Sequence, residues 1–393
     1  MGYPPRVRSS ALFVALFLDL LGFGMIIPNI QIFAESFTQD GRLIGAMLSS
    51  MFLVQVFASP FWGRLSDRVG RRPVAVGCTL FAGLGNLTYG FAGGLEWLFL
   101  SRMLAGLGGA NVAVASAYVS ANTPESHRTG QMGKVSAAIA LGLMTGPSIG
   151  GIVGESLGNL SVGIFAAAAS GLSALLLTWA MKGEPKKQEA IEDRPKAKRG
   201  AWDLLRTLPD LRNLVLVSVI AWFSLATLEG TFGRLLKNEM GLGEKEFGWI
   251  FGYESLIAFA IQAYLLQKIS QRFSDRTLLS CSYLLQGLGL ALFPLAPSLG
   301  FLFLASTLYA PGSAIANPTI NALASRLTAD DRQGELFGLL QSTRTAGFLI
   351  GPTLGGAMFD WNPASPYFLA GGICLMASLY CLSFLRSPSP QTT

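Results

Sequence analysis

Apolar stretches of about 20 residues, separated by short polar loops, run through all 393 residues of the chain. A helix needs ~20 apolar residues to cross a bilayer, whereas barrel strands would alternate over ~10 residues. The pattern therefore predicts an all-α polytopic membrane protein with twelve transmembrane helices. We expect the spans at 10–33, 42–62, 74–92, 96–120, 133–154, 158–181, 211–236, 247–269, 276–295, 299–324, 335–358 and 366–385.

The composition supports this interpretation and excludes other classes of protein. Hydrophobic residues make up 51% of the chain and charged residues 13%, where a soluble domain carries about 25% charged residues. Four cysteines are too few for a disulfide scaffold. The basic residues that give the net charge of +6 lie in short loops between apolar runs, so we expect no nucleic-acid partner. The first apolar run is too long for a cleaved signal peptide.

The basic residues orient the chain in the membrane. If the predicted spans are correct, 23 of the 29 Lys and Arg residues lie on the side that holds both termini, and four lie on the other side. Because cytoplasmic loops are enriched in Lys and Arg, both termini are predicted to be cytoplasmic. The expected location is the bacterial inner (plasma) membrane.

The two halves of the sequence repeat each other. A shift of 204 residues places Trp97-Leu-Phe-Leu100 on Phe301-Leu-Phe-Leu304, with further matches at the cytoplasmic loops. Duplicated six-helix halves are typical of transporters whose binding site lies between them. The predicted domains are an N-terminal bundle (1–181), a cytoplasmic linker (182–210) and a C-terminal bundle (211–393). The linker is interpreted as a solvated tether, with contact to anionic lipid as the alternative.

The loop after the second predicted span reads GRLSDRVGRRP over 63–73. Gly63 and Gly70 permit backbone turns, and Asp67 can form a charge network with the neighbouring bases Arg64, Arg68, Arg71 and Arg72. This loop resembles the signature loop of the major facilitator superfamily. The resemblance implies that Asp67 helps to latch the two halves in one state and that the Arg residues stabilise this latch. The second-half copy has Gln271 instead of the acid, so the latch would be asymmetric.

The fifth predicted span carries glycines in steps of four, at Gly142, Gly146, Gly150 and Gly154. Such a face lets another helix approach closely, and close packing alone would explain it. The run with Pro147 and Gly151 also resembles the fifth-span motif of the proton-coupled antiporters in the superfamily. A second ridge follows in span 11 at Gly347, Gly351 and Gly355.

Asp19 stands in the middle of the first predicted span. A carboxylate there costs roughly 2.5–3.5 kcal/mol, so it should face a cavity, form a pair or be protonated. The run to Pro28 resembles the first span of twelve-helix drug/proton antiporters, including tetracycline exporters. That resemblance implies that Asp19 carries the coupling proton and that Arg102 in span 4 assists. We expect the two to pair; alternatively, Arg102 anchors helices through backbone carbonyls.

The second half offers polar residues that could line a substrate cavity. Glu229 and Glu254 are candidate proton or cation sites, with interfacial solvation as the alternative. Arg344 has no evident acidic partner in its own half. The sequence allows two roles for Arg344, helix packing and contact with the substrate. The remaining candidates are the amides Gln262, Asn317 and Asn321, for which interhelical hydrogen bonds are the alternative.

These features predict a proton-coupled exporter of small hydrophobic or cationic compounds that works by alternating access. No phosphate-binding loop and no nucleophile–base pair is recognisable, so we expect neither direct use of ATP nor an enzyme. The single histidine, His127, cannot form a metal site alone. The expected energy source is the proton gradient, without cofactors, and the expected state is a monomer in the lipid bilayer. Alternatives are another cargo (a sugar, an organic anion or a lipid-like molecule) or a non-transporting membrane receptor.

Overall fold

The computed structural model describes residues 9–123, 125–181, 201–329 and 332–384, and all regular elements in these ranges are helices. In chain order they are α1 (Ser9–Glu35), α2 (Gly41–Val69), α3 (Arg71–Gly90), α4 (Leu95–Gly108), α5 (Asn111–Ala121), α6 (Glu125–Ala180), α7 (Ala201–Thr207), α8 (Pro209–Met240), α9 (Glu244–Ala260), the π-helix η1 (Ile261–Leu265), α10 (Leu266–Arg272), α11 (Asp275–Leu292), the 3₁₀ helix η2 (Phe293–Leu295), α12 (Leu299–Leu327), α13 (Gln333–Trp361) and α14 (Ser365–Phe384).

The helices agree with the predicted all-α membrane fold. Within the described ranges, nine helical stretches are long and apolar enough to cross a membrane. One of them, Gln131–Ala180, has 50 residues, which is enough for two crossings. The other two predicted spans coincide with α3 and α13.

Two predicted spans meet without a loop inside α6. The backbone leaves helical geometry at Gly158, where φ is 79° and ψ is 169°. Residues with a Cβ rarely adopt a positive φ, so glycine makes the turn between predicted spans 5 and 6. The predicted fourth span is broken instead, because α4 ends at Gly108 and α5 begins at Asn111.

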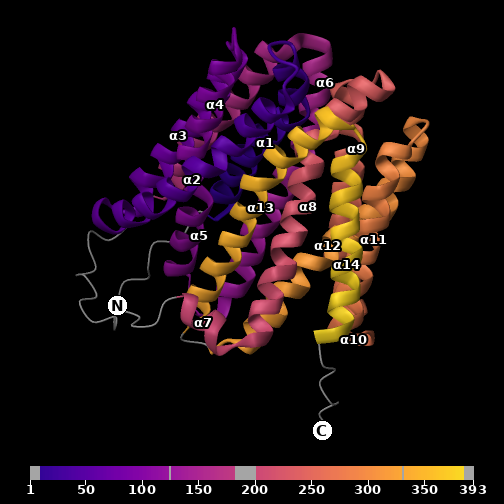
Figure 1. Ribbon diagram of the computed structural model, residues 1–393. Coiled ribbons are helices and arrows are strands. Elements are labelled where there is room, and N and C mark those ends of the chain that lie inside the picture. Colours follow the sequence, from indigo (N-terminus) through magenta and orange to yellow (C-terminus); the bar gives the residue numbers. More distant parts are fainter. Residues whose placement is uncertain (1–8, 124, 182–200, 330–331, 385–393) are drawn as a thin grey trace. The chain divides into compact units, whose positions relative to one another are not determined.

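The chain forms two compact units. The first comprises 1–39, 46–192 and 241–252, and the second comprises 40–45, 193–240 and 253–393. In the first unit α6 packs along α1 and α3, and in the second unit α8 packs along α13 while α11 packs against α12 and α14 (Figure 1). The pair α1–α6 thus has a counterpart in α8–α13, as expected for a duplicated sequence.

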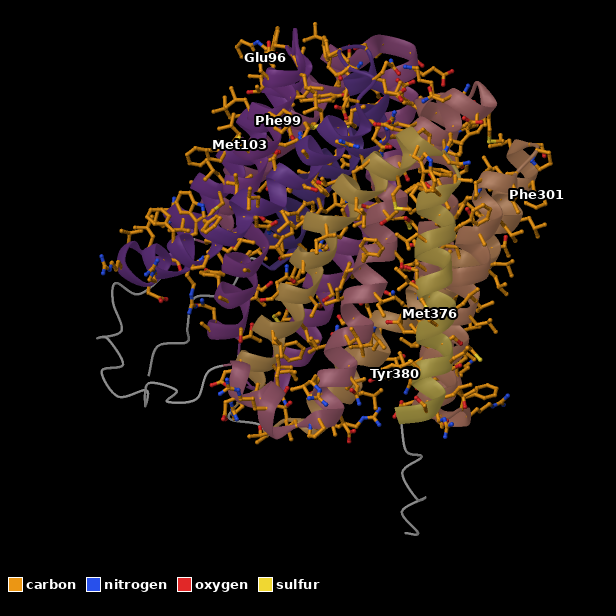
Figure 2. The ribbon with its side chains drawn as sticks, viewed as in Figure 1. Glu96, Phe99, Met103, Phe301, Met376 and Tyr380 are labelled. Carbon is orange, nitrogen blue, oxygen red and sulfur yellow. The ribbon has the colours of Figure 1, made fainter. Side chains whose placement is uncertain are left out.

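Apolar side chains cover the outside of these helices. Met103 on α4 and Met376 on α14 point away from their own units (Figure 2) and are 44% and 64% exposed. Large exposed apolar surfaces in water would be unfavourable, but in a bilayer they face lipid tails. The exposed apolar residues therefore agree with an integral membrane protein.

Two details differ from the sequence predictions. Gly63 makes no turn, because α2 continues as a helix to Val69 beyond the expected end of span 2. Exposed Arg64, Asp67 and Arg68 side chains let this last part continue as a helix up to Gly70. The linker is not a simple tether over its last part, since 201–207 form α7. Arg332 binds Asp203 of α7 at 3.2 Å and Glu335 at 2.7 Å. Linker residues 182–200 lie outside the described ranges, as do residues 1–8 and 385–393 at the termini.

Candidate functional site

The glycine ridge of α6 packs directly on α1. A Cβ added at Gly142 would lie 2.7 Å from the carbonyl oxygen of Phe17, and one at Gly146 would lie 2.7 Å from the Cα of Gly24. Ordinary Cβ contacts begin near 3.4 Å, so only glycine allows this approach. Asn29 of α1 is fully buried and donates to the Gly150 carbonyl at 2.9 Å. The ridge therefore brings two helix backbones together beside Asp19.

The second unit repeats this arrangement. A Cβ on Gly351 of α13 would lie 2.8 Å from the Cβ of Ala226 on α8, and one on Gly347 would lie 2.6 Å from Trp222. A hydrogen bond of 2.7 Å between Ser218 and Thr343 joins the same two helices. Both predicted ridges thus pack helices closely. Their role in antiport stays a prediction.

Asp19 lies on the buried side of α1, and its side chain is 8% exposed. The amide of Asn111, the first residue of α5, donates a hydrogen bond to Asp19 Oδ2. Within the described part of the chain, Asp19 Oδ1 has no hydrogen-bond partner. The carboxyl group is therefore held by one neutral donor and has one oxygen available.

Arg102 does not pair with Asp19 in this structure, contrary to the expectation. Its guanidinium is 4% exposed and donates to the hydroxyl of Ser101 at 3.0 Å. Arg102 precedes Asn111 by nine residues, which corresponds to roughly 13 Å along a helix axis. Since Asn111 is at the level of Asp19, Arg102 lies about that much further along the bundle. The role of Arg102 in proton transfer stays a prediction.

The predicted latch loop turns at Gly70, where φ is 96°. This positive φ separates α2 from α3 and explains the glycine. Arg71 donates to the carbonyl oxygen of Ala117 in α5 at 3.0 Å, so the loop is attached to the helix that begins with Asn111. Asp67 and Arg68 are exposed and Arg72 is half-buried; a charge network around Asp67 stays a prediction.

Three of the charged candidates in the second unit form a cluster. Glu254 on α9 is 8% exposed and accepts a hydrogen bond of 2.7 Å from Ser306. Glu229 on α8 interacts electrostatically with both Glu254 and Arg344. Arg344 also lies over the ring of Trp222 at 5.1 Å. Arg344 therefore has an acidic neighbour in its own half, which the sequence did not reveal.

The polar amide candidates are less enclosed. Gln262 is exposed and lies in the π-helix η1, where it donates to the Ala314 carbonyl of α12 at 3.2 Å. This is the interhelical hydrogen bond considered as its alternative role. On α12, Asn317 is half-buried and Asn321 is exposed.

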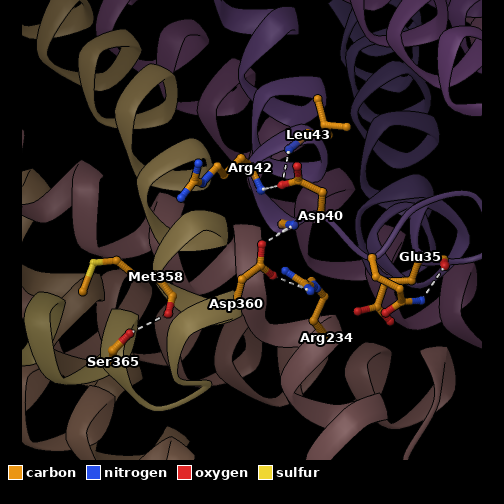
Figure 3. A network of polar contacts seen from close by, with 10 residues as sticks. Glu35, Asp40, Arg42, Leu43, Arg234, Met358, Asp360 and Ser365 are labelled. Atoms are coloured by element: carbon orange, nitrogen blue, oxygen red, sulfur yellow. Dashed lines mark hydrogen bonds and ion pairs between the residues drawn. The ribbon is translucent and has the colours of Figure 1, made fainter.

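A polar contact that the sequence analysis missed lies in the second unit (Figure 3). Arg234 of α8 is 4% exposed and binds Asp360 of α13 at 3.0 Å. The other Asp360 oxygen accepts from the backbone N–H of Gly41 at 2.7 Å. The signal available in the sequence was that Arg234 is one of four bases that the predicted spans place on the non-cytoplasmic side. Asn111 was also missed, because an amide gives no charge signal.

The described residues contain no group of three or more His, Cys, Asp or Glu side chains that could hold a metal ion. His127 lies in the first turn of α6. Cys78, Cys374 and Cys381 are buried, Cys281 is exposed, and all four are free thiols.

Comparison with known families gives a match over almost the whole chain. The family model of the Major Facilitator Superfamily matches residues 12–242 and 214–393. Multidrug resistance protein 2 of Bacillus subtilis is 27% identical over 367 residues, which cover 92% of this chain and 91% of that protein. The class B tetracycline resistance protein of Escherichia coli is 26% identical over 378 residues, covering 95% and 93% of the two chains.

Solved structures show the same fold at lower identity. The human organic anion transporter MFSD10 (TETRAN) superposes with a TM-score of 0.71 at 21% identity, covering 96% of this chain and all of that one. A bacterial homologue of the human lysosomal transporter Spinster gives a TM-score of 0.76 at 17% identity, covering 97% and 93%.

Proposed function

The chain belongs to the Major Facilitator Superfamily, and from that premise we propose that it exports small hydrophobic or cationic compounds in exchange for protons by alternating access. The relatives of similar length named for multidrug and tetracycline resistance support this cargo class. The cell location that fits is a bacterial plasma membrane, with both termini cytoplasmic and the protein acting as a monomer.

The observation that carries the proposal is the environment of Asp19. Its carboxyl group is buried, has no cationic partner among the described residues and accepts one hydrogen bond. Ionised, it can attract a cationic cargo molecule; protonated, it cannot. Since a ligand shifts a conformational equilibrium only by its differential affinity for the two states, proton and cargo would compete through this group.

The other candidate residues have supporting roles in this proposal. The loop 63–73 would latch one state at the cytoplasmic side, and the close α1–α6 packing would limit proton leakage past Asp19. The cluster of Glu229, Glu254 and Arg344 would contact cargo from the second half of the chain. The energy source would be the proton gradient, without a cofactor.

Proteoliposomes with an acidic interior test the proposal. Ethidium is permanently charged, so it does not accumulate as a weak base, and its gradient-driven uptake reports exchange for protons. We expect uptake by the native protein and none by Asp19→Asn. The asparagine can still accept a hydrogen bond from Asn111 but cannot take up a proton.

Asp210→Asn is the matched control, because Asp210 is exposed at the start of α8. This variant should retain full uptake. Full gradient-driven uptake by Asp19→Asn would refute the assignment of the proton carrier. Uptake of an anionic dye in place of ethidium would instead favour the organic-anion alternative.

A further inference from the structure

The helix break in the fourth span fixes the orientation of the Asn111 side chain. Because α4 ends at Gly108, the first N–H groups of α5 lack the carbonyl partners that a continuous helix would supply. Asn111 Oδ1 accepts the N–H of Val112 at 2.5 Å. The amide can therefore only present its NH₂ group to α1, and this group donates to Asp19.

From this geometry we propose that Asn111 is the positioning residue for Asp19. It holds Oδ2 as a hydrogen-bond acceptor, and the coupling proton therefore binds to Oδ1. An amide NH₂ group donates and does not accept, so Oδ2 must present a lone pair in both charge states of Asp19. In a protonated carboxyl group the carbonyl oxygen is a stronger acceptor than the hydroxyl oxygen, so this donor favours Oδ2 as the carbonyl. Oδ1 accepts no hydrogen bond from the described residues and is the oxygen left for the proton.

The charge of the site follows from the neutral partner. If Arg102 neutralised Asp19, protonation would have to break an ion pair. Because Asn111 is neutral and keeps its hydrogen bond, protonation takes the site from a charge of −1 to neutral while the carboxyl group stays in place. This would allow the site to change its attraction for a cation without a side-chain rearrangement. The inference rests on the proposed role of Asp19 in coupling.

Three helices, α3, α5 and α6, pack near α1 and carry the ionisable side chains that could affect Asp19. Cys78 of α3 is buried and interacts electrostatically with Asp19. The other ionisable residues of these helices lie further along the chain from this level: Arg71, Arg72 and Tyr89 on α3, Tyr118 on α5, and Glu125, His127, Arg128, Lys134 and Glu155 on α6. Asn111 is thus the polar group that holds the Asp19 carboxyl group.

Infrared titration of the purified protein tests the inference without any cargo. The C=O stretch of protonated Asp19 is the band that Asp19→Asn lacks. Asn111→Ala removes the donor. The titration midpoint of the Asp19 carboxyl group should then move about one pH unit toward alkaline pH, since a hydrogen bond to a charged group favours the ionised form. The band should also shift to higher wavenumber, because its carbonyl oxygen, Oδ2, loses the donor.

Asn86→Ala is the matched control, since Asn86 is another buried asparagine of the same unit and bonds Ser170 at 3.2 Å. It should leave both the midpoint and the band unchanged. If Asn111→Ala does not fold, Asn111→Leu removes the donor while keeping most of the volume. An unchanged midpoint in the donor-free variant would overturn the positioning role. An unchanged wavenumber would place the proton on Oδ2 and overturn the assignment to Oδ1.

The two proposals can fail separately. A band that shifts as expected in a protein without proton-driven uptake would reject the export function and keep the role of Asn111. Normal uptake, together with an infrared band that is unchanged in Asn111→Ala, would keep the export function and reject the role of Asn111.

Discussion

Arg234 and Asp360 join α8 to α13 through an ion pair of 3.0 Å, and the same carboxylate accepts the N–H of Gly41 at 2.7 Å. The guanidinium also lies 4.6 Å from the ring centre of Phe359. Asp360 is therefore a charge partner of the buried arginine, and its other oxygen binds the first residue of α2.

Replacing Asp360 should destabilise the protein. Asp360→Asn removes one negative charge beside Arg234, whose side chain is 4% exposed. The expected loss is about 1.5–3 kcal/mol of the free energy of unfolding, the range for hydrogen bonds to charged groups. The measurement is the unfolding temperature of the purified protein in detergent. Asp275→Asn is the control, because its partner Arg326 is 63% exposed and such pairs contribute about 0–1 kcal/mol. Equal effects of the two changes would contradict the structural role of Asp360.

A Cβ at Gly41 should break the same contact. In Gly41→Ala the added carbon would lie 2.6 Å from Asp360 Oδ1 and still closer to Arg234, so the ion pair must move. We expect a lower unfolding temperature, checked in the same detergent assay. Gly171→Ala, where an added Cβ meets nothing within 4 Å, should be neutral or stabilising, since alanine favours a helix by about 1 kcal/mol over glycine. A neutral Gly41→Ala would show that the segment is free to shift.

Close α1–α6 packing should be sensitive to a single methyl group. Gly146→Ala would place a Cβ 2.7 Å from the backbone of Gly24 and force the two helices apart. The expected result is loss of gradient-driven ethidium uptake together with reduced thermal stability. Gly133→Ala lies on the same helix in open space and should retain both properties. If Gly146→Ala takes up ethidium as fast as the native protein, close packing at the glycine ridge is not required for transport.

Loss of the Glu254 charge should weaken the binding of a cationic compound. Glu254→Gln can still accept the hydrogen bond of Ser306 but removes one negative charge from a buried site. We expect the half-saturating ethidium concentration to rise about tenfold, equivalent to about 1.4 kcal/mol, with coupling to the proton gradient intact. Initial uptake rates over a range of ethidium concentrations measure this.

Ser306→Ala is the companion variant for Glu254, since it removes the donor and keeps the acid. It should change the half-saturating concentration much less than Glu254→Gln does. If both variants behave like the native protein, the Glu254 cluster has no part in cargo binding.

Much of the fold was predictable because a bilayer leaves little choice to the backbone. Only helices or closed barrels satisfy every N–H and C=O group in lipid, so the length of each apolar run predicted a helix. The repeat of span 5 in span 11 likewise predicted two ridges, and both pack on a neighbouring helix as their spacing indicated. Span ends were less predictable, as α2 shows, because a helix can continue into water.

The candidate site was only partly predictable. Burial of Asp19 followed from its place in the first span, and a turn at Gly70 followed from its surroundings. The pairing of Asp19 with Arg102 was expected from charge, yet the break between α4 and α5 places Asn111 at the carboxylate. The interaction of Arg344 with Glu229 joins two helices more than a hundred residues apart in the chain, which no local pattern reports.

The sequence by itself determined the helical class, the duplicated halves and the presence of an acid in the first span, because these depend on hydropathy, helix length and residue type. Only the tertiary structure decided which side chains meet: Asn111 with Asp19, Arg234 with Asp360, and Arg344 with Glu229. The reason is physical, since a hydrogen bond or ion pair depends on a few ångströms of helix register and rotation, which packing of the whole unit fixes.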